Sequence, residues 1–173
     1  MSKKLIIMRG LSGSGKSTLA KELVAIERQR QVELPQIFST DEFFFERETG
    51  EYNFDGSKLA EAHAWNQQRV EGLMRDLYAY RGGQGWQSVT LIVDNTNTMM
   101  SEAQPYVELA RKYGYNVEFH EPTTPWARDP KVCAEKTKHG VPLEAIERQL
   151  ARWEPFTNVI TFTEDKGEAI CDT

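Results

Sequence analysis

A glycine-rich segment that directly follows an apolar run constrains the fold of this chain more than any other feature. Residues 10–18 read Gly-Leu-Ser-Gly-Ser-Gly-Lys-Ser-Thr and come after Leu5-Ile6-Ile7-Met8. This matches the pattern G-x-x-x-x-G-K-[ST], which predicts a loop that wraps the phosphates of a nucleoside triphosphate. The glycines permit backbone angles that let successive N–H groups converge on one phosphate. The alternative is a glycine-rich turn without a ligand, which the flanking strand and helix patterns make the weaker interpretation.

The residue types in this loop predict ATP and Mg²⁺ as cofactors. Lys16 is expected to act as a catalytic cation on the β- and γ-phosphates, and the Ser17 hydroxyl is expected to bind Mg²⁺. Leu19, Leu23 and Ile26 have helical spacing, so a helix dipole would also favour the anion. The residues expected to contact the triphosphate are Gly10, Ser12, Gly13, Ser14, Gly15, Lys16, Ser17 and Thr18.

Composition indicates one globular domain of 173 residues, 39% hydrophobic and 27% charged. No apolar run approaches the roughly 20 residues of a membrane span, so no membrane partner is expected. The first strand begins at the N-terminus without room for a signal peptide, and Cys133 and Cys171 match no paired spacing. These features predict a cytoplasmic protein with free thiols. Nothing in the sequence predicts the oligomeric state.

The net charge of −5 argues against a broad basic face that wraps nucleic acid. It does not exclude contact with a single phosphate-bearing end, which depends on local charge.

Apolar patterns alternate between short β-rich runs and longer helical stretches. Strands are expected over 4–8, 36–39, 89–94, 116–120 and 159–162, and helices over 16–30, 57–80, 101–113, 124–136 and 142–153. This alternation predicts a three-layer α/β/α fold with a parallel sheet of about five strands. We expect a P-loop domain over 1–163 with a C-terminal lid at about 133–153, followed by a loose acidic end over 164–173.

Acidic and amide side chains follow two of the expected strands. Ligands of parallel sheets bind at the carboxyl ends of strands. Asp41 could therefore accept a proton from an attacking hydroxyl, or it could simply cap a helix. Asp94 ends an apolar strand and is expected to hold Mg²⁺. Asn95, Thr96 and Asn97 could bind an acceptor or serve as turn residues.

The expected lid contains several basic residues around a His-Gly-Val-Pro segment at 139–142. Lys136 and Arg148 are the candidates for a cation that closes over the transferred phosphoryl group. The alternative for this run is a solvated charged helix. His63, Trp65 and Asn66 lie in the long expected helix, where a lone His or Trp usually belongs to the core or to an interface.

Several blocks together resemble a known family. They are Arg9-Gly10 with Gly15-Lys16-Ser17, Ser39-Thr40-Asp41, Tyr52-x-Phe54, Ala62-His63-Ala64-Trp65-Asn66, Val93-Asp94-Asn95-Thr96-Asn97, Pro105-Tyr106-Val107, Glu121-Pro122-x-Thr124-x-Trp126 and His139-Gly140-Val141-Pro142. Over residues 3–155 the chain resembles the NEDD-binding-protein-two-like P-loop kinases, which are related to the 5′-kinase domains of phage and animal polynucleotide kinases.

The resemblance implies an ATP-dependent kinase that acts on the 5′-hydroxyl end of RNA or DNA. In that family's pattern Asp41 matches the general base and Asp94 the carboxylate that closes the third strand. It also implies an acceptor site that includes Thr40, Phe44, His63, Asn66, Asn95, Thr96 and Asn97.

Two positions depart from the family pattern. Lys136-Thr137 stands where the lid has Arg-Asn, which keeps the charge and loses the bidentate fork. Phe44 stands where phage enzymes have an arginine that grips an acceptor phosphate. Two alternatives therefore stay open: a kinase of a nucleotide, sugar nucleotide or antibiotic, and a nucleotide-binding regulatory protein with weak hydrolysis.

Overall fold

A mostly parallel sheet forms the centre of the fold, and its strands are the short apolar runs of the sequence. The computed structural model describes residues 2–79, 88–157, 159–162 and 169–171. Within them, six strands pair in the order β2-β3-β1-β4-β5-β6. Their bounds are β1 Ser2–Met8, β2 Leu34–Phe38, β3 Ser88–Val93, β4 Asn116–Pro122, β5 Val159–Phe162 and β6 Ala169–Cys171. The first five are parallel, which confirms the predicted sheet.

The sixth strand corrects one expectation. Ala169–Cys171 pairs antiparallel with β5, whereas the sequence indicated a loose end over 164–173. A run of three residues is too short to show the alternation that identifies a strand. The other residues of that predicted segment lie outside the described part of the chain.

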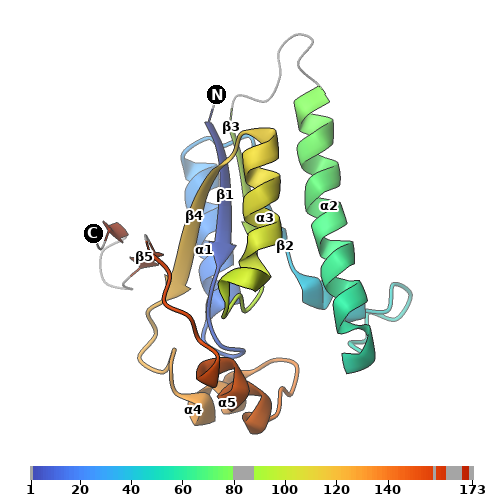
Figure 1. The fold of residues 1–173 in the computed structure, drawn as a ribbon, viewed down its shortest axis with the longest axis vertical. Helices are drawn as coiled ribbons and strands as arrows, with labels where there is room; N and C mark the ends of the chain where they lie inside the picture. Colours follow the sequence, from blue (N-terminus) through green and yellow to red (C-terminus); the bar gives the residue numbers. More distant parts are fainter. Residues whose placement is uncertain (1, 80–87, 158, 163–168, 172–173) are drawn as a thin grey trace.

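Helices cover both faces of the sheet, as Figure 1 shows. The α-helices are α1 Lys16–Gln29, α2 Leu59–Ala79, α3 Met100–Tyr113, α4 Pro130–Lys136 and α5 Leu143–Ala151, and short 3₁₀ helices span η1 Thr40–Phe44 and η2 Gly56–Lys58. Side chains of β1 alternate between two cores, because successive residues of a strand point to opposite faces. Ile6 and Met8 pack against α1, and Leu5 and Ile7 pack towards α2 and α3. This confirms the three-layer architecture.

The start of α4 was predicted wrongly. The expected helix began at Thr124, but α4 begins at Pro130, and the Asp129 side chain caps it by accepting from the N–H groups of Lys131 and Val132 at 3.0 and 3.3 Å. An Asp-Pro pair supplies a cap and a preset φ, which makes it the stronger start signal. Residues 124–128 form a turn instead.

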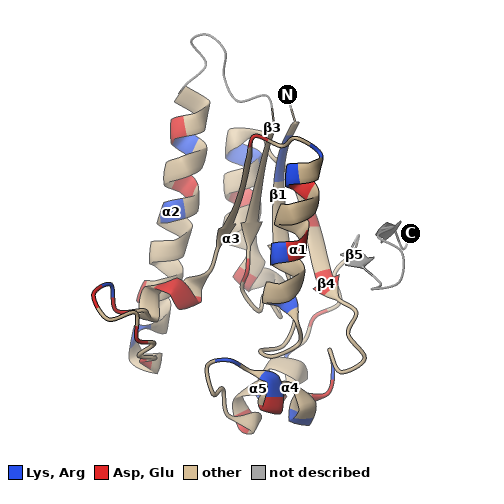
Figure 2. Cartoon of the chain, turned by 180° about the vertical axis from the view of Figure 1, so that it is seen from behind, with Lys and Arg blue, Asp and Glu red and all other residues tan. Residues whose placement is uncertain are grey.

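The helices α4 and α5 stand together at the carboxyl ends of the strands (Figure 1). They share a small core with the glycine-rich loop that consists of Leu11, Cys133 and Ile146. Figure 2 shows Lys and Arg interspersed with Asp and Glu on the helices, without a broad basic face in that view. None of the described helices combines the length and apolar character needed to cross a bilayer.

Candidate active site

The glycine-rich loop folds back on itself between β1 and α1. The Gly10 N–H donates to the carbonyl of Thr96 at 3.0 Å, which ties the loop to the end of β3. Gly10, Gly13 and Gly15 have φ values of +156°, +82° and +104°, which side chains rarely permit. Gly15 directly precedes Lys16, the first residue of α1. The N–H groups at the start of α1 are therefore part of the loop, as an anion site requires.

Lys16 lies inside this loop and is 8% exposed. Its Nζ donates to the carbonyl of Leu11 across the loop at 2.8 Å. Burial lowers the pKa of Lys16, while the negative charges of Asp94 and Asp41 oppose that shift. Ser17 and Thr18 are exposed and line the adjacent cleft, together with Ser12, Gly13 and Gly15. Ser14 is buried, and its hydroxyl has no hydrogen-bond partner among the described residues.

Asp94 follows β3 at the carboxyl edge of the sheet. Its N–H donates to the carbonyl of Phe38 at 2.8 Å, so the ends of β2 and β3 are held together. Its Oδ1 is buried and has no hydrogen-bond partner within the described residues. A buried carboxylate oxygen without a donor, in a cleft shared with the Ser17 hydroxyl, fits the oxygen ligands that Mg²⁺ takes from proteins.

Asp41 lies in η1, directly after β2, and is exposed to the cleft. The structure assigns the cap of η1 to Ser39, whose Oγ accepts from the Asp41 N–H at 3.3 Å. The Asp41 carboxylate is therefore not the cap. Partial loss of solvent within the cleft raises the pKa of Asp41, and electrostatic interactions with His139 and the Lys16 ammonium oppose that shift.

Four of the residues predicted on the acceptor side lie at the cleft. The Asn95 side chain holds η1 in place, since its Oδ1 accepts from the Thr40 N–H at 3.0 Å. Thr40 Oγ1 and His63 Nδ1 are 3.4 Å apart, and burial lowers the pKa of His63. Thr96 lies on the same rim.

Three other residues predicted on the acceptor side are buried and do not line the cleft, so their role in binding an acceptor stays a prediction. Asn66 Nδ2 donates to the Tyr106 hydroxyl at 3.1 Å, and Asn97 Nδ2 donates to the carbonyl of Met8 at 2.8 Å. Phe44 is 5% exposed and packs behind Tyr52 and Phe54. The side-chain amides of Asn66 and Asn97 therefore donate hydrogen bonds to protein oxygens, as buried polar groups usually do. Gly10 likewise does not line the cleft but shapes the loop.

The lid packs directly on the glycine-rich loop. Gln149 of α5 accepts from the Ser12 N–H at 2.9 Å and donates to the Ser12 hydroxyl at 3.1 Å. Trp126 donates to the carbonyl of Gly13 at 3.3 Å. The sequence identified neither residue as part of the loop's surroundings. Glutamine and tryptophan carry no charge pattern that would mark them as such.

Lys136 and Arg148, the two predicted lid cations, are both exposed side chains of the cleft lining. The Lys136 ammonium lies 4.2 Å from the centre of the Trp126 ring. The cleft has a volume of about 990 Å³, and among the described residues five Lys or Arg and three Asp or Glu line it. The local charge therefore favours an anionic ligand, although the whole chain carries −5.

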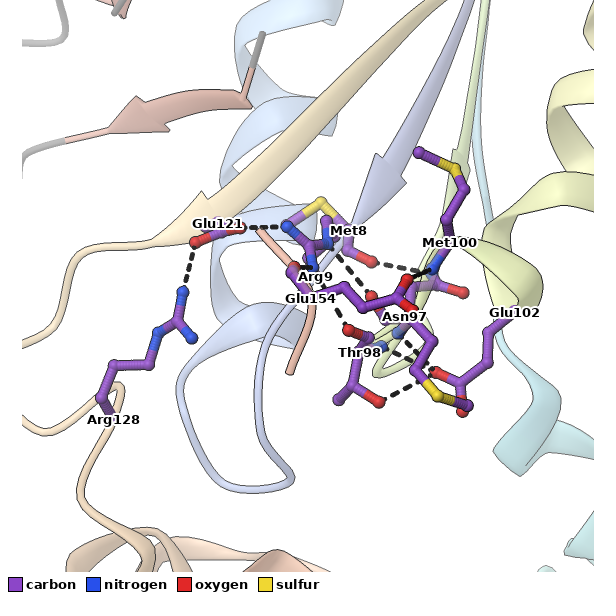
Figure 3. Close-up of polar contacts among 10 residues, drawn as sticks. Met8, Arg9, Asn97, Thr98, Met100, Glu102, Glu121, Arg128 and Glu154 are labelled. Atoms are coloured by element: carbon purple, nitrogen blue, oxygen red, sulfur yellow. Dashed lines mark hydrogen bonds and ion pairs between the residues drawn. The ribbon is translucent and has the colours of Figure 1, made fainter. Parts of the chain in front are cut away.

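Arg9 anchors the base of the loop, and Figure 3 shows its contacts. The side chain is fully buried, pairs with Glu121 at 2.7 Å and donates to the carbonyl of Glu154 at 2.6 Å. Its guanidinium lies over the Phe156 ring at 3.3 Å. Burial lowers the pKa of Arg9 to about 10, mainly through desolvation, so it stays charged at neutral pH. These contacts join the loop to β4 and to the segment that follows α5.

Sequence comparison finds relatives along most of the chain. Residues 5–156 match a family model described as an AAA domain. NEDD4-binding protein 2 from Homo sapiens is 39% identical over 155 residues, which make up 90% of this chain and 8% of that protein. An uncharacterized protein from Pasteurella multocida is 30% identical over 116 residues, which make up 67% of this chain and 62% of that protein. The chain therefore spans less than two thirds of the length of either relative.

Solved structures with the same fold include two nucleotide complexes. Kti12 from Chaetomium thermophilum in complex with ADP-AlF3 has a TM-score of 0.59 at 14% identity and covers 95% of this chain and 91% of its own. The Mycobacterium tuberculosis APS kinase CysC in complex with AMPPNP and APS has a TM-score of 0.56 at 17% identity, with 96% and 92% covered. At these identities the similarity shows the fold alone, a three-layer α/β/α P-loop domain.

Proposed function

This chain belongs to the AAA domain family, and from this membership and its cleft we propose that it is an ATP-dependent kinase whose acceptor is the 5′-hydroxyl end of RNA or DNA. The glycine-rich loop and Lys16 would hold the triphosphate. Asp41 would act on the acceptor hydroxyl, and the basic residues of the lid would close over the phosphates.

The main support for the proposal is that Asp41 lies in the same cleft as Lys16. The charge of each residue influences the pKa of the other. Nucleotide binding alone does not require a partly desolvated carboxylate beside the phosphate-binding lysine, because a negative charge there does not favour an anionic ligand. A kinase needs such a group, because the attacking hydroxyl must lose a proton during transfer. The raised pKa of Asp41 also makes it a stronger proton acceptor than an ordinary aspartate.

The reaction step follows from these positions. The acceptor hydroxyl oxygen forms a bond to the γ-phosphorus of ATP while its proton passes to the Asp41 carboxylate. The bond between the γ-phosphorus and the bridging oxygen breaks, and ADP leaves with the electron pair. Lys16, with Lys136 or Arg148 from the lid, would stabilise the negative charge that spreads over the phosphoryl oxygens. Ser17 and Asp94 would hold Mg²⁺, which when bound supplies further positive charge there.

Support for a polynucleotide acceptor comes from the sequence blocks and from local charge. The blocks around His63 and Asp94 resemble those of polynucleotide 5′-kinases, and the chain is 39% identical to the matching part of human NEDD4-binding protein 2. The excess of Lys and Arg in the cleft lining suits two anionic substrates, a triphosphate and a nucleic-acid end.

A kinase of a small hydroxyl compound is the second candidate. Small-ligand sites usually have volumes of roughly 300–1,000 Å³, and the cleft of about 990 Å³ would hold ATP with a small acceptor. This candidate shares the roles of Lys16 and Asp41 and differs only in the acceptor.

An acceptor panel with γ-labelled ATP tests the proposal. We expect label on 5′-hydroxyl RNA or DNA oligonucleotides and none on the same oligonucleotides with a 5′-phosphate. The variant Lys16→Ala controls for a contaminating kinase and should transfer no label. Transfer to small hydroxyl compounds alone would support the second candidate. Release of labelled phosphate to water without any acceptor would contradict both kinase assignments.

A further inference from the structure

Aromatic side chains lie along one side of the cleft. This aromatic wall consists of Tyr52 and Phe54, which line the cleft, and of the neighbouring Phe45, all on the segment that follows η1. Phe54 is 57% exposed and Phe45 is 41% exposed. Phe45 and Tyr52 are joined by an isolated antiparallel bridge. The buried Phe44 supports the wall from behind, with ring centres 4.9 Å from Phe54 and 6.3 Å from Tyr52.

The wall stands beside the reacting groups. Tyr52 and Phe54 line the same cleft as Asp41 and His63. Desolvation raises the pKa of Tyr52 to about 12, and the negative charge of Asp41 adds to that shift, which is consistent with their proximity. On the lid side, the His139 ring stacks on Tyr52 with centres 4.1 Å apart and an angle of 29° between planes. One face of Tyr52 is therefore covered by a protein ring, and Phe54 is the more exposed aromatic side chain of the wall.

The chemistry around the wall matches that of a nucleic-acid site. Proteins that bind single-stranded nucleic acid combine exposed aromatic platforms with cations that follow the backbone phosphates. Here the lid supplies such cations to the same cleft, namely Lys136, Lys138, Arg148 and Arg152. An exposed phenylalanine also gains from a ligand that covers it, since burial of apolar surface is favourable. A nucleobase offers both the flat apolar face and the attached anionic chain.

We propose that the aromatic wall binds the terminal nucleobase of the acceptor, which stacks on Phe54 next to Tyr52 while the 5′-hydroxyl of the same nucleotide reaches Asp41. This inference rests on the proposed function and narrows the acceptor to an end that carries a base. Because every base has a π-face, the wall should tolerate any of the four bases. A sugar or alcohol without a planar ring would gain nothing from it.

The test compares acceptors that differ only in the terminal base. Two 5′-hydroxyl oligonucleotides are used, one intact and one abasic at its first nucleotide. Stacking is worth about 1–3 kcal/mol per base, so we expect wild type to show a KM about tenfold higher for the abasic acceptor. Phe54→Ala should raise the KM for the intact acceptor by about the same factor and leave the abasic KM and the ATP KM unchanged. Phe54→Tyr should restore wild-type values.

Tyr78→Ala removes another exposed aromatic side chain, 41% exposed, from the last turn of α2. That end of α2 lies away from α4 and α5 (Figure 1), so neither KM should change. Equal KM values of wild type for the two acceptors, or an equal effect of Phe54→Ala on both, would overturn the inference.

A binding measurement separates this inference from the proposed function. A 5′-hydroxyl oligonucleotide with 2-aminopurine as its first base should lose fluorescence when it binds wild type, because stacking quenches that base. Phe54→Ala should reduce the quenching. If quenching follows this pattern but no phosphate is transferred, the aromatic wall binds the base and the kinase assignment is wrong. If wild type transfers phosphate without quenching, the kinase assignment is supported and base binding by the aromatic wall is contradicted. The absence of both signals contradicts both.

Discussion

At the scale of single residues, Asp41 links stability to the proposed chemistry. Its carboxylate lies in the cleft with a pKa above the ordinary value, mainly because of desolvation. An acid with a raised pKa in the folded state favours folding at low pH, and this contribution is lost as pH rises through the folded pKa. The charged carboxylate thus destabilises the fold at neutral pH.

We therefore expect Asp41→Asn to have a higher Tm than wild type at pH 7. The difference should shrink as pH falls through the raised pKa, because the wild-type carboxyl becomes neutral as well. Thermal unfolding from pH 7 downwards measures this, with Asp76→Asn as the control, since Asp76 lies on the exposed surface of α2 beside Arg75. A Tm below that of wild type across the whole range would contradict the assigned cause.

Arg9 has a structural role, so we expect its replacement to lower the stability of the fold, in contrast to Asp41→Asn. Its removal would leave Glu121 and several carbonyls without their buried partner. Breaking a buried pair in this way costs about 3–5 kcal/mol of unfolding free energy, which we expect for Arg9→Met. Arg128 pairs with the same Glu121 at 2.9 Å but is about half exposed, with 46% of its side chain accessible. Arg128→Met should therefore cost about 1 kcal/mol or less, measured by urea unfolding. Similar costs for the two variants would contradict the role of Arg9.

The positions of the charged residues at the cleft were easier to predict from the sequence than the hydrogen-bond partners of the asparagine side chains. Asp41, Asp94 and Lys16 could be placed because strand ends and a loop pattern fix their positions along the chain. Asn66 and Asn97 could not, because an amide serves a ligand or a protein group equally well. Only the folded chain shows that Tyr106 and the carbonyl of Met8 take those hydrogen bonds. Their catalytic or binding roles, where the geometry permits them, stay predictions.

At the scale of elements, the contact between the glycine-rich loop and α4 gives a sharp test. A Cβ on Gly13 would collide with the backbone carbonyl of Cys133, whereas a Cβ on Gly50 would meet nothing within 4 Å. The two glycines have similar φ values of +82° and +72°, so alanine should strain both backbones by about 1–2 kcal/mol.

We expect only Gly13→Ala to displace the lid, and therefore only this variant to lose ATP affinity, by at least about tenfold. Gly50→Ala serves as its matched control for backbone strain, and titration calorimetry with ATP and Mg²⁺ measures both. Equal ATP affinities of the two variants would show that the loop and α4 do not act together.

The lid also shows where element-level prediction fails. Its basic residues and its glycine at position 140 marked the segment, and in the structure Gln149 of this segment contacts Ser12 of the loop. The start of α4 was missed because Thr124-Pro125 and Asp129-Pro130 both resemble helix starts in the sequence. Thr124 instead donates to the carbonyl of Ser14 at 2.9 Å, so a tertiary contact uses the side chain that would have capped a helix.

At the scale of the whole molecule, alternation of strands and helices was enough to predict the layers. The tertiary contacts that join distant segments of the chain were not predictable from the sequence. Arg9 brings together the loop, β4 and the segment after α5, residues separated by up to 145 positions, and no local pattern reports such contacts. Likewise the net charge of −5 concealed a cleft lined by more basic than acidic residues. Ligand binding depends on the charged side chains near the cleft, and their positions become known only from the folded structure.

Single-turnover transfer from γ-labelled ATP to a 5′-hydroxyl oligonucleotide, by wild type and by Asp41→Asn, tests whether Asp41 is the general base of a kinase. General-base catalysis typically contributes 10²–10⁴-fold, so the rate of transfer should fall by roughly 100-fold or more in the variant, while its affinity for ATP stays within about twofold. Transfer by Asp41→Asn at the wild-type rate would contradict the account.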